Sequence, residues 1–384
     1  MSLARHRRQP TGALILPVIA TLLLAAPARA QDRPLPLGEG QDLQELTGEA
    51  GHELQITGFA VGNYSYAGRT RENSFAASKI ALSLFRELSD HVWIFGQLTT
   101  ALEDPEEEGG DPVTEIEIDN LLVNLTPPGL SNLSLSFGKF DIPLGFERDD
   151  EPLNLQPTTS FNFELGRPAK MVGVVGRWAL SPQADLTVMG GNGWNSEIDP
   201  NELKTGGVRL GVLPSEHVSL GLGGMFGNEG AEDETTERYL LSFDYAVQPA
   251  STWIIGGEAN WGGDHDAAPG GGDAQWYGAT MTLFHRLVRR FGVVARAEVL
   301  RDRDGARTGV PQTLTSYTLA PLYFLGTGRE GIFANVEHTT FRIPRLQVRA
   351  EARLDHSSEP VFADGDGNPD TWDLNFVFQI VATF

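Results

Sequence analysis

The segment WDLNFVFQIVATF, Trp372–Phe384, ends the chain and has two chemically different faces. Every second residue is apolar and falls on one face: Leu374, Phe376, Phe378, Ile380, Ala382 and Phe384. The opposite face carries Asp373, Asn375, Gln379 and Thr383, with Val377 and Val381 as apolar exceptions. A period of two is typical of a β-strand and not of a helix. Because the apolar face continues to Phe384, the whole strand can face lipid.

Three further segments alternate in the same way. In Leu346–Asp355 one face is apolar and the other reads Gln-Arg-Glu-Arg-Asp, and Phe291–Leu300 follows the same pattern. Trp253–Trp261 has a tryptophan at each end, as expected of aromatic girdles at two membrane interfaces. A soluble β-sandwich also alternates, but it rarely carries so many charges along one strand. The pattern therefore predicts an all-β fold, an antiparallel up-and-down transmembrane β-barrel.

The connections between candidate strands alternate in length, as short periplasmic turns and long outer loops do. Seventeen segments qualify as strands, whereas a single-chain bacterial barrel has an even number. The excess lies in 314–324 and 331–342, of which we expect one to be loop. We predict about sixteen strands, with fourteen or eighteen as alternatives. A one-residue slip in the alternation near Asp119-Asn120 predicts a β-bulge or the membrane boundary.

The first thirty residues have the parts of a secretory signal peptide. A basic start precedes the apolar stretch Ala13–Ala26, and Ala28-Arg29-Ala30 offers a cleavage site. An uncleaved anchor is the less favoured alternative. We therefore expect a signal peptide at 1–30, a periplasmic lead-in at 31–53 and the barrel at 54–384, in the bacterial outer membrane.

The chain is strongly acidic and has no cysteine. Its formal net charge is −22, and loss of residues 1–30, which hold four arginines and no acid, changes this to −26. Such a charge disfavours nucleic acid as a partner. The absence of cysteine excludes thiolate catalysis and cysteine-based metal sites.

The longest interruption of the strand pattern is Asp141–Lys170. Loops of this length without a structure of their own are uncommon and usually functional. Folded into the lumen, it would narrow the pore and select solutes by charge and size; an external flap with solvated charges is the alternative. The predicted constriction residues are Glu147, Arg148, Asp149, Asp150, Glu151, Arg167 and Lys170.

Charged residues at inward strand positions should line the lumen. These candidates are Arg177, Glu258, Arg296, Glu298, Arg349, Glu351, Arg353 and Asp355. A wide, wet lumen explains such residues without a specific solute site, so we interpret them as a general lining.

The stretch GKFDIPLGFE, Gly138–Glu147, resembles a motif of porin-type outer-membrane proteins, and the terminal strand resembles their closing strand. The nearest group is the putative β-barrel porin-2 (OmpL-like) family, with phosphate-selective porins more distant. The resemblance implies a diffusion channel for small hydrophilic solutes, surrounded by outer-membrane lipid and lipopolysaccharide. It also implies recognition of the strand ending at Phe384 by the barrel-assembly machinery, and a possible homo-trimer. Phosphate is disfavoured, because a phosphate-selective lumen needs arginines and lysines whereas this chain is acidic.

Metal-binding and catalytic motifs are weak. The sequence DGDGNPD resembles the first half of a calcium loop, with alternate ligand positions at Asp364, Asp366, Asn368 and Asp370. However, Pro369 replaces the usual glycine and no closing glutamate follows. Asp264-His265-Asp266 is interpreted as solvated loop. Since the G-x-S-x-G, H-E-x-x-H and phosphate-loop motifs are missing, we expect no enzyme and no cofactor, with calcium as a minor alternative.

These observations favour a passive porin. Because acids outnumber bases, we expect the pore to prefer cations. The alternative is a non-transporting barrel, structural or adhesin-type, with a plugged lumen. An outer-membrane hydrolase is less favoured, because the chain lacks the motifs.

Overall fold

The computed structural model describes residues 54–103, 113–199, 201, 203–230, 236–325 and 344–384. All of them belong to the second of two units, Pro34–Phe384. The predicted signal peptide at 1–30, the lead-in at 31–53 and the candidate strand 331–342 lie outside the described residues. No helix in the described ranges is long and apolar enough to cross a membrane.

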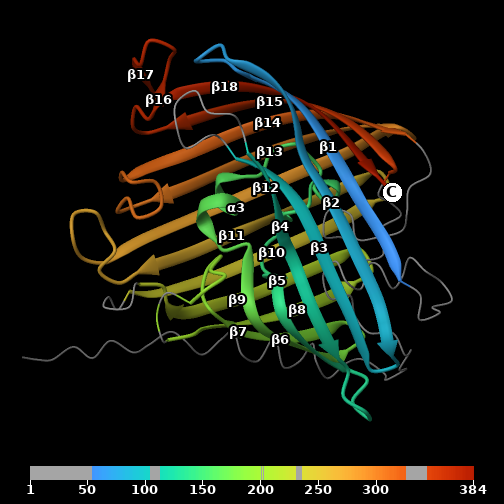
Figure 1. Cartoon of the computed structure of the whole chain (residues 1–384). Helices are drawn as coiled ribbons and strands as arrows, with labels where there is room; N and C mark the ends of the chain where they lie inside the picture. Colours follow the sequence, from blue (N-terminus) through green and yellow to red (C-terminus); the bar gives the residue numbers. More distant parts are fainter. Residues whose placement is uncertain (1–53, 104–112, 200, 202, 231–235, 326–343) are drawn as a thin grey trace, which may run out of the picture. The chain divides into compact units, whose positions relative to one another are not determined.

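Within the described residues, sixteen strands form a closed antiparallel barrel (Figure 1). Each strand pairs with its neighbours in sequence, and β18 closes the ring by pairing with β15 and β1. The strands are β1 Gln55–Ala67, β2 Asn73–Ser89, β3 Val92–Glu103, β4 Val113–Leu125, β5 Leu133–Asp141, β6 Lys170–Ser181, β7 Ala184–Gly191, β8 Thr205–Ser215, β9 Val218–Asn228, β10 Glu237–Ala250, β11 Trp253–Asp264, β12 Ala274–Val288, β13 Phe291–Asp302, β14 Gln312–Leu325, β15 Leu346–Ser357 and β18 Trp372–Thr383. A separate small hairpin consists of β16 Phe362–Ala363 and β17 Pro369–Asp370. The predicted β-barrel is confirmed.

The strand count follows from the pairing of β14. This strand contains the candidate 314–324 and pairs directly with β15, so sixteen strands close the ring. The predicted β-bulge is also confirmed: Gln97 faces Asn120, the next residue Leu98 faces Ile118, and Asp119 is the extra residue.

The terminal strand seals the barrel against β1. Gly58 and Phe384 exchange two backbone hydrogen bonds, of 3.0 and 2.9 Å. A Cβ at Gly58 would lie 2.4 Å from the Ala81 carbonyl oxygen and 2.7 Å from the Phe384 ring, so this close approach requires glycine. The predicted apolar face of β18 points outward, where Phe376 and Phe378 are each 44% exposed.

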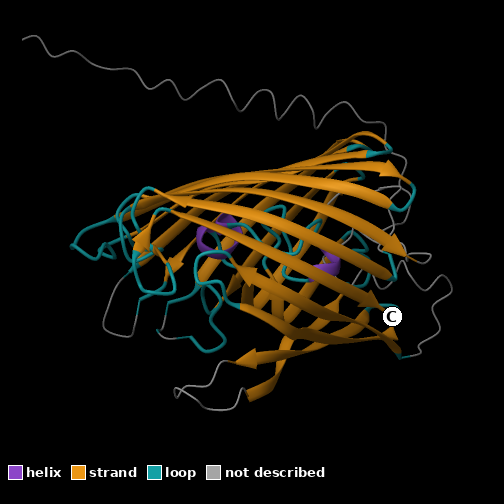
Figure 2. Cartoon of the chain, turned by 90° about the horizontal axis from the view of Figure 1, so that it is seen from above, coloured by secondary structure: helices purple, strands orange, loops and turns teal. Residues whose placement is uncertain are grey.

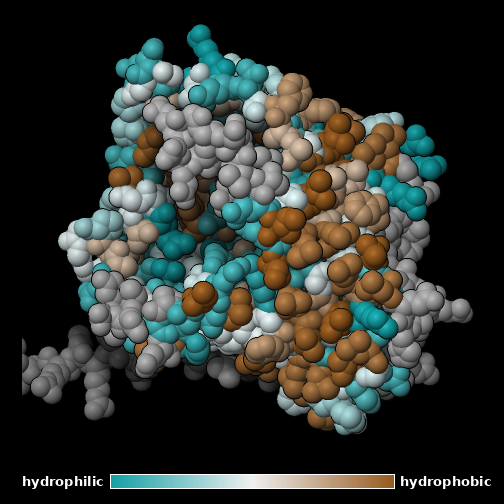
Figure 3. Space-filling model, in the orientation of Figure 1, coloured by the Kyte–Doolittle hydropathy of each residue, from teal (hydrophilic) through white to brown (hydrophobic). Residues whose placement is uncertain are grey.

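The outer face of the barrel is apolar. Large exposed hydrophobic side chains include Ile116 and Val123 on β4 and Phe137 on β5. Figure 3 shows hydrophobic residues gathered over the strands at the front of the view, beside a hollow lined by hydrophilic residues. This distribution suits a wall that faces lipid outside and water inside.

Strand β5 separates from β4 before its end, although it stays paired with β6 through Asp141. It pairs with β4 only between Leu121–Leu125 and Leu135–Lys139. Gly138 has a φ of 137°, and a Cβ there would lie 1.8 Å from the Leu121 carbonyl oxygen. Only glycine permits this approach, which lies where β5 separates from β4 and just before the long loop 142–169 begins.

Candidate functional site

The long segment between β5 and β6, residues 142–169, folds back inside the barrel (Figure 2). It contains the short helices η1 Glu151–Leu153 and α3 Phe161–Gly166. The helix α3 packs against β11, β12 and β13, and η1 packs against β18. Ser160 begins α3 as its N-cap, accepting a hydrogen bond of 3.0 Å from the backbone N–H of Phe163. We call residues 142–169 the inserted segment.

Apolar side chains fix the inserted segment to one side of the lumen. Leu144 is fully buried in a cluster with Trp276 and Leu300 of the wall. Phe146 packs in a second cluster with Ile254 and Phe284. The Trp276 indole N–H also donates to the Gly166 carbonyl oxygen at 2.9 Å. The segment therefore forms a hydrophobic core with side chains of β5–β7 and β9–β14.

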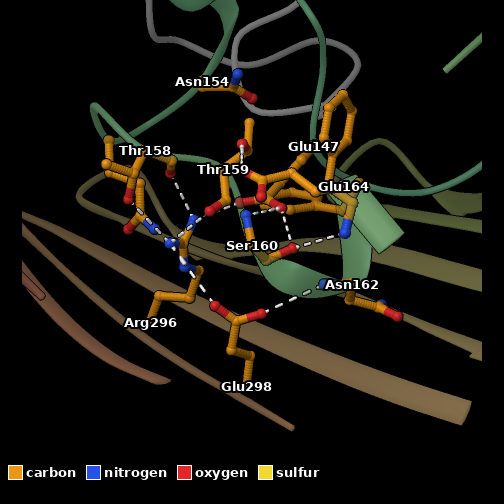
Figure 4. A network of polar contacts seen from close by, with 12 residues as sticks. Glu147, Asn154, Thr158, Thr159, Ser160, Asn162, Glu164, Arg296 and Glu298 are labelled. Atoms are coloured by element: carbon orange, nitrogen blue, oxygen red, sulfur yellow. Dashed lines mark hydrogen bonds and ion pairs between the residues drawn. The ribbon is translucent and has the colours of Figure 1, made fainter. Parts of the chain in front are cut away.

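A polar network holds the segment at its centre (Figure 4). The carboxylate of Glu147 accepts from the Arg296 guanidinium at 2.7 Å and from the backbone N–H of Ser160 at 3.0 Å. Arg296 also donates to the carbonyl oxygens of Thr158 and Thr159, at 2.6 and 3.1 Å. Since Arg296 and Glu147 are almost entirely buried, this contact acts as a tether to the wall rather than a surface ion pair.

A second tether joins Arg167 to Glu258. The Arg167 Nε lies 3.0 Å from the Glu258 carboxylate, and both side chains are buried. The same carboxylate accepts from the backbone N–H of Phe146 at 2.5 Å. Arg167 further donates to the Glu147 carbonyl oxygen at 2.7 Å, which ties the two ends of the segment together.

Strand β15 supplies a third set of contacts. Arg353 donates to the Thr159 carbonyl oxygen at 2.7 Å, and Glu351 accepts from the Thr158 hydroxyl at 2.5 Å. Arg349 donates to the Glu151 carbonyl oxygen at 3.0 Å. Asp355 in turn accepts from Arg353 at 2.9 Å. The alternating charges of β15 thus face the segment and pair with it or with one another.

Where the segment meets β2 and β4–β6, two lysines lie among five carboxylates. We call this group the acid–lysine cluster; it consists of Lys79, Asp119, Asp141, Asp149, Asp150, Glu151 and Lys170. The side chains of Asp149, Asp141 and Glu151 are 32%, 25% and 23% exposed, against 14% for Lys170 and 16% for Lys79, so these three acids are more open to water than the lysines.

Burial and the two lysines set the ionisation of the segment's acids. Burial acts to raise the pKa of Asp149, but Lys170 and Lys79 outweigh it and hold the pKa below its usual range. Burial raises the pKa of Glu151, with Lys79 only partly opposing it. Burial, together with nearby Arg167, lowers the pKa of Arg148. The pKa directions therefore imply that Asp149 stays charged to a lower pH than Glu151.

The predicted site residues fall into two groups. Glu147, Asp150 and Arg167 are buried in contacts with the wall, whereas Arg148, Asp149, Glu151 and Lys170 are partly exposed. Of the predicted lumen residues, Glu258, Arg296, Glu298, Arg349, Glu351, Arg353 and Asp355 surround the segment or pair beside it. Arg177 instead pairs with Asp185, at 2.9 Å.

Sequence reasoning missed several residues of the site. Lys79 is one, although the apolar outward positions Ile80 and Leu82 indicated that it points inward. Asp119 is another, and it lies in the bulge that was predicted. No sequence pattern marked the backbone carbonyls of Thr158 and Thr159, which only the fold brings to the arginines.

The calcium-like sequence forms the turn of the β16–β17 hairpin. Asp364 accepts from the backbone N–H groups of Asp366 and Asn368, at 3.0 and 2.9 Å. Asp370 forms an ion pair with Arg69. In the described part of the chain, the one group of three acidic or histidine side chains close enough to share a metal ion is exposed, and consists of His265, Asp266 and Asp273.

Comparison with known proteins points to one family. Residues 94–384 match the family model described as "Putative beta-barrel porin-2, OmpL-like". No curated protein matches the chain.

Solved structures share the fold at low sequence identity. In-vitro folded OmpT of Vibrio cholerae, in its trimer form, is 12% identical with a TM-score of 0.56, covering 86% of this chain and 99% of that one. The anion-selective porin from Comamonas acidovorans is 8% identical with a TM-score of 0.59, covering 86% and 99%. OmpF of Salmonella typhi, in complex with daunomycin, is 9% identical with a TM-score of 0.58, covering 87% and 98%.

Proposed function

The chain belongs to the putative β-barrel porin-2 (OmpL-like) family, and from this premise we propose that it is an outer-membrane porin through which small hydrophilic solutes diffuse passively. It needs no cofactor and performs no catalytic step in this role. The observation that carries the proposal is the inserted segment, held inside a closed sixteen-strand barrel by buried charge pairs. A segment in that position narrows the lumen and exposes charges to passing solutes.

The constriction is formed by the partly exposed charges of the inserted segment and the strands beside it. Asp149, Glu151 and Lys170 contribute directly, and so does the partly exposed Arg148, whose charge is influenced by Asp244 of the wall. Glu147, Asp150 and Arg167 act indirectly, because they keep the segment in place.

The pore prefers cations. The acid–lysine cluster has five carboxylates and two lysines, so three negative charges are left over in the formal charge of the cluster. The charges of the buried ion pairs that hold the segment nearly cancel, since their arginines pair with a similar number of acids. An uncompensated acidic group at a narrow point raises the local concentration of cations.

Planar-bilayer recording tests the proposal. The refolded protein should give discrete conductance steps, and a KCl gradient should give a reversal potential of the sign expected for K⁺ preference. Absence of conductance steps would overturn the porin role. Steps with a reversal potential of the opposite sign would overturn only the cation preference.

A non-transporting barrel is the second candidate. The observation that favours it is the apolar packing of the inserted segment, which fills part of the lumen with side chains such as Leu144, Phe146 and Trp276. The same recording separates the two candidates, because a plugged barrel gives no conductance steps.

We extend the proposal to export and assembly. Residues 1–30 act as a cleaved signal peptide, and the barrel-assembly machinery recognises the strand that ends at Phe384. One structurally similar protein is described as a trimer, which supports a homo-trimer here. The mass of the folded protein in mild detergent, measured by light scattering, would distinguish a trimer from a monomer.

A further inference from the structure

The ammonium group of Lys170 lies among three carboxylates. Its Nζ is 2.9 Å from Asp119, 2.5 Å from Asp141 and 3.2 Å from Asp149. An ammonium group has three N–H donors and no acceptor, so three carboxylates can satisfy it completely. The wall and the inserted segment together thus form a cage that suits a primary ammonium group.

A second ammonium group lies beside the first. The Nζ of Lys79 is 3.6 Å from Glu151, 3.8 Å from Asp150 and 3.9 Å from Asp149. Lys79 and Lys170 contact the same oxygen of Asp149, so this carboxylate belongs to the surroundings of both ammonium groups. The cluster therefore holds two neighbouring ammonium groups in its resting state.

The cluster can accept more positive charge than its lysines supply. Asp119 is only 8% exposed, and among the described residues its second carboxylate oxygen, Oδ2, has no hydrogen-bond partner. A buried carboxylate oxygen without a partner is costly, and a bound donor would relieve that cost. On the more open side, Asp141 and Asp149 are 25% and 32% exposed, so a solute can reach them.

The spacing of the carboxylates disfavours a bare metal ion. A metal ion needs several ligand oxygens within a few ångströms of one another. Among the described residues that condition is met only at the exposed group containing His265, and not in the acid–lysine cluster. Organic cations with N–H donors are a better match for acids spread around an ammonium group.

We propose that the acid–lysine cluster is a binding station for small organic cations that carry primary ammonium groups. This inference rests on the proposed porin function and names the class of solute that the pore favours. A solute ammonium group donates hydrogen bonds to the exposed carboxylates of Asp141 and Asp149, as the Lys170 ammonium group does. Neutral solutes of the same size pass without binding, and anionic solutes are repelled.

The test uses 1,5-diaminopentane as the probe and the neutral 1,5-pentanediol as its matched control. Added to the protein in a planar bilayer, the diamine should reduce the single-channel K⁺ current in a concentration-dependent, saturable way, whereas the diol should not. Asp149→Asn should raise the half-blocking concentration roughly fivefold, as loss of one partly exposed ion pair implies. Asp141→Asn serves as a second variant. Asp266→Asn, in an exposed loop, is the control, and the diamine should block it at the same half-blocking concentration as the wild type.

Isothermal titration of the folded protein in detergent with the same diamine separates the two proposals. Conductance without diamine block or binding overturns the binding station and leaves the porin intact. Equal block by diamine and diol, or an unchanged half-blocking concentration in both Asp149→Asn and Asp141→Asn, overturns it as well. Saturable binding that Asp149→Asn weakens, in a protein without conductance, supports the station and overturns the porin.

Discussion

Replacing Arg296 by methionine tests whether buried charge pairs hold the inserted segment in the lumen. The Arg296 guanidinium is fully buried and binds Glu147 at 2.7 Å and the Thr158 carbonyl oxygen at 2.6 Å. Methionine retains an unbranched side chain but leaves Glu147 buried without its partner. Breaking a buried pair in this way costs about 3–5 kcal/mol. The strand ladder does not depend on this contact, so we expect the cost to fall on the docked state of the segment.

Hydrogen exchange and conductance both report on docking. A loss of about 3 kcal/mol raises the undocked population on the order of 100-fold. Backbone amides of residues 156–166 should then exchange with deuterium correspondingly faster, measured by mass spectrometry on the folded protein in detergent. Single-channel conductance should become larger and noisier as the segment leaves the constriction.

Arg301→Met is the matched control. Arg301 lies on the same strand, β13, but it binds the Thr313 hydroxyl at 2.6 Å and has no contact with the segment in the described network. Its replacement should leave exchange of residues 156–166 unchanged, and the barrel strands should stay protected in both variants. Exchange at the wild-type rate in Arg296→Met would refute the reasoning.

Three further changes test other parts of the structure. Trp276→Phe removes the indole donor to the Gly166 carbonyl oxygen, so segment docking should weaken by about 0.5–1.5 kcal/mol; unchanged amide exchange would contradict this. Gly58→Ala places a Cβ 2.7 Å from the Phe384 ring, so folding into lipid vesicles should slow, seen as less heat-modifiable folded band on gels; folding at the wild-type rate would argue against the packing described. On acidification from pH 7, Glu151 should lose its charge before Asp149, because burial raises the pKa of Glu151 whereas lysines hold that of Asp149 below its usual range. Asp149 thus adds to the free energy of unfolding at neutral pH, and this contribution is lost as the pH falls through its depressed pKa. Reversal potentials should show cation preference falling in two steps, and a single step would count against this assignment.

The barrel could be predicted because lipid constrains every second residue. Along β18, the outward positions must be apolar, so parity alone identifies the two faces. The slip at Asp119 was visible for the same reason, since an extra residue moves all later side chains to the other face. The number of strands needed the structure, because only the direct pairing of β14 with β15 decides between the two doubtful segments.

The inserted segment was harder to predict because it has no period. Whether Glu147 faces water or the wall depends on Arg296, which lies far away in the sequence and close only in the fold. Charge alone could not separate Asp149, which is partly exposed, from its neighbour Asp150, which is buried against Gln97. Lys79 carried a parity signal, but its importance depends on Asp149, Asp150 and Glu151 of the inserted segment, which lie far from it in the sequence.

The tethers of the inserted segment also have a consequence for the order in which the protein matures. Thr158 and Thr159 bind Arg296 and Arg353, which follow them by 138 and 194 positions in the chain. Contacts between such distant positions form late. Strands β5 and β6 should therefore form a hairpin while the segment is still solvated, and docking should await β13 and β15. Pulse-labelling during refolding would test this hypothesis, and early protection of residues 156–166 would contradict it.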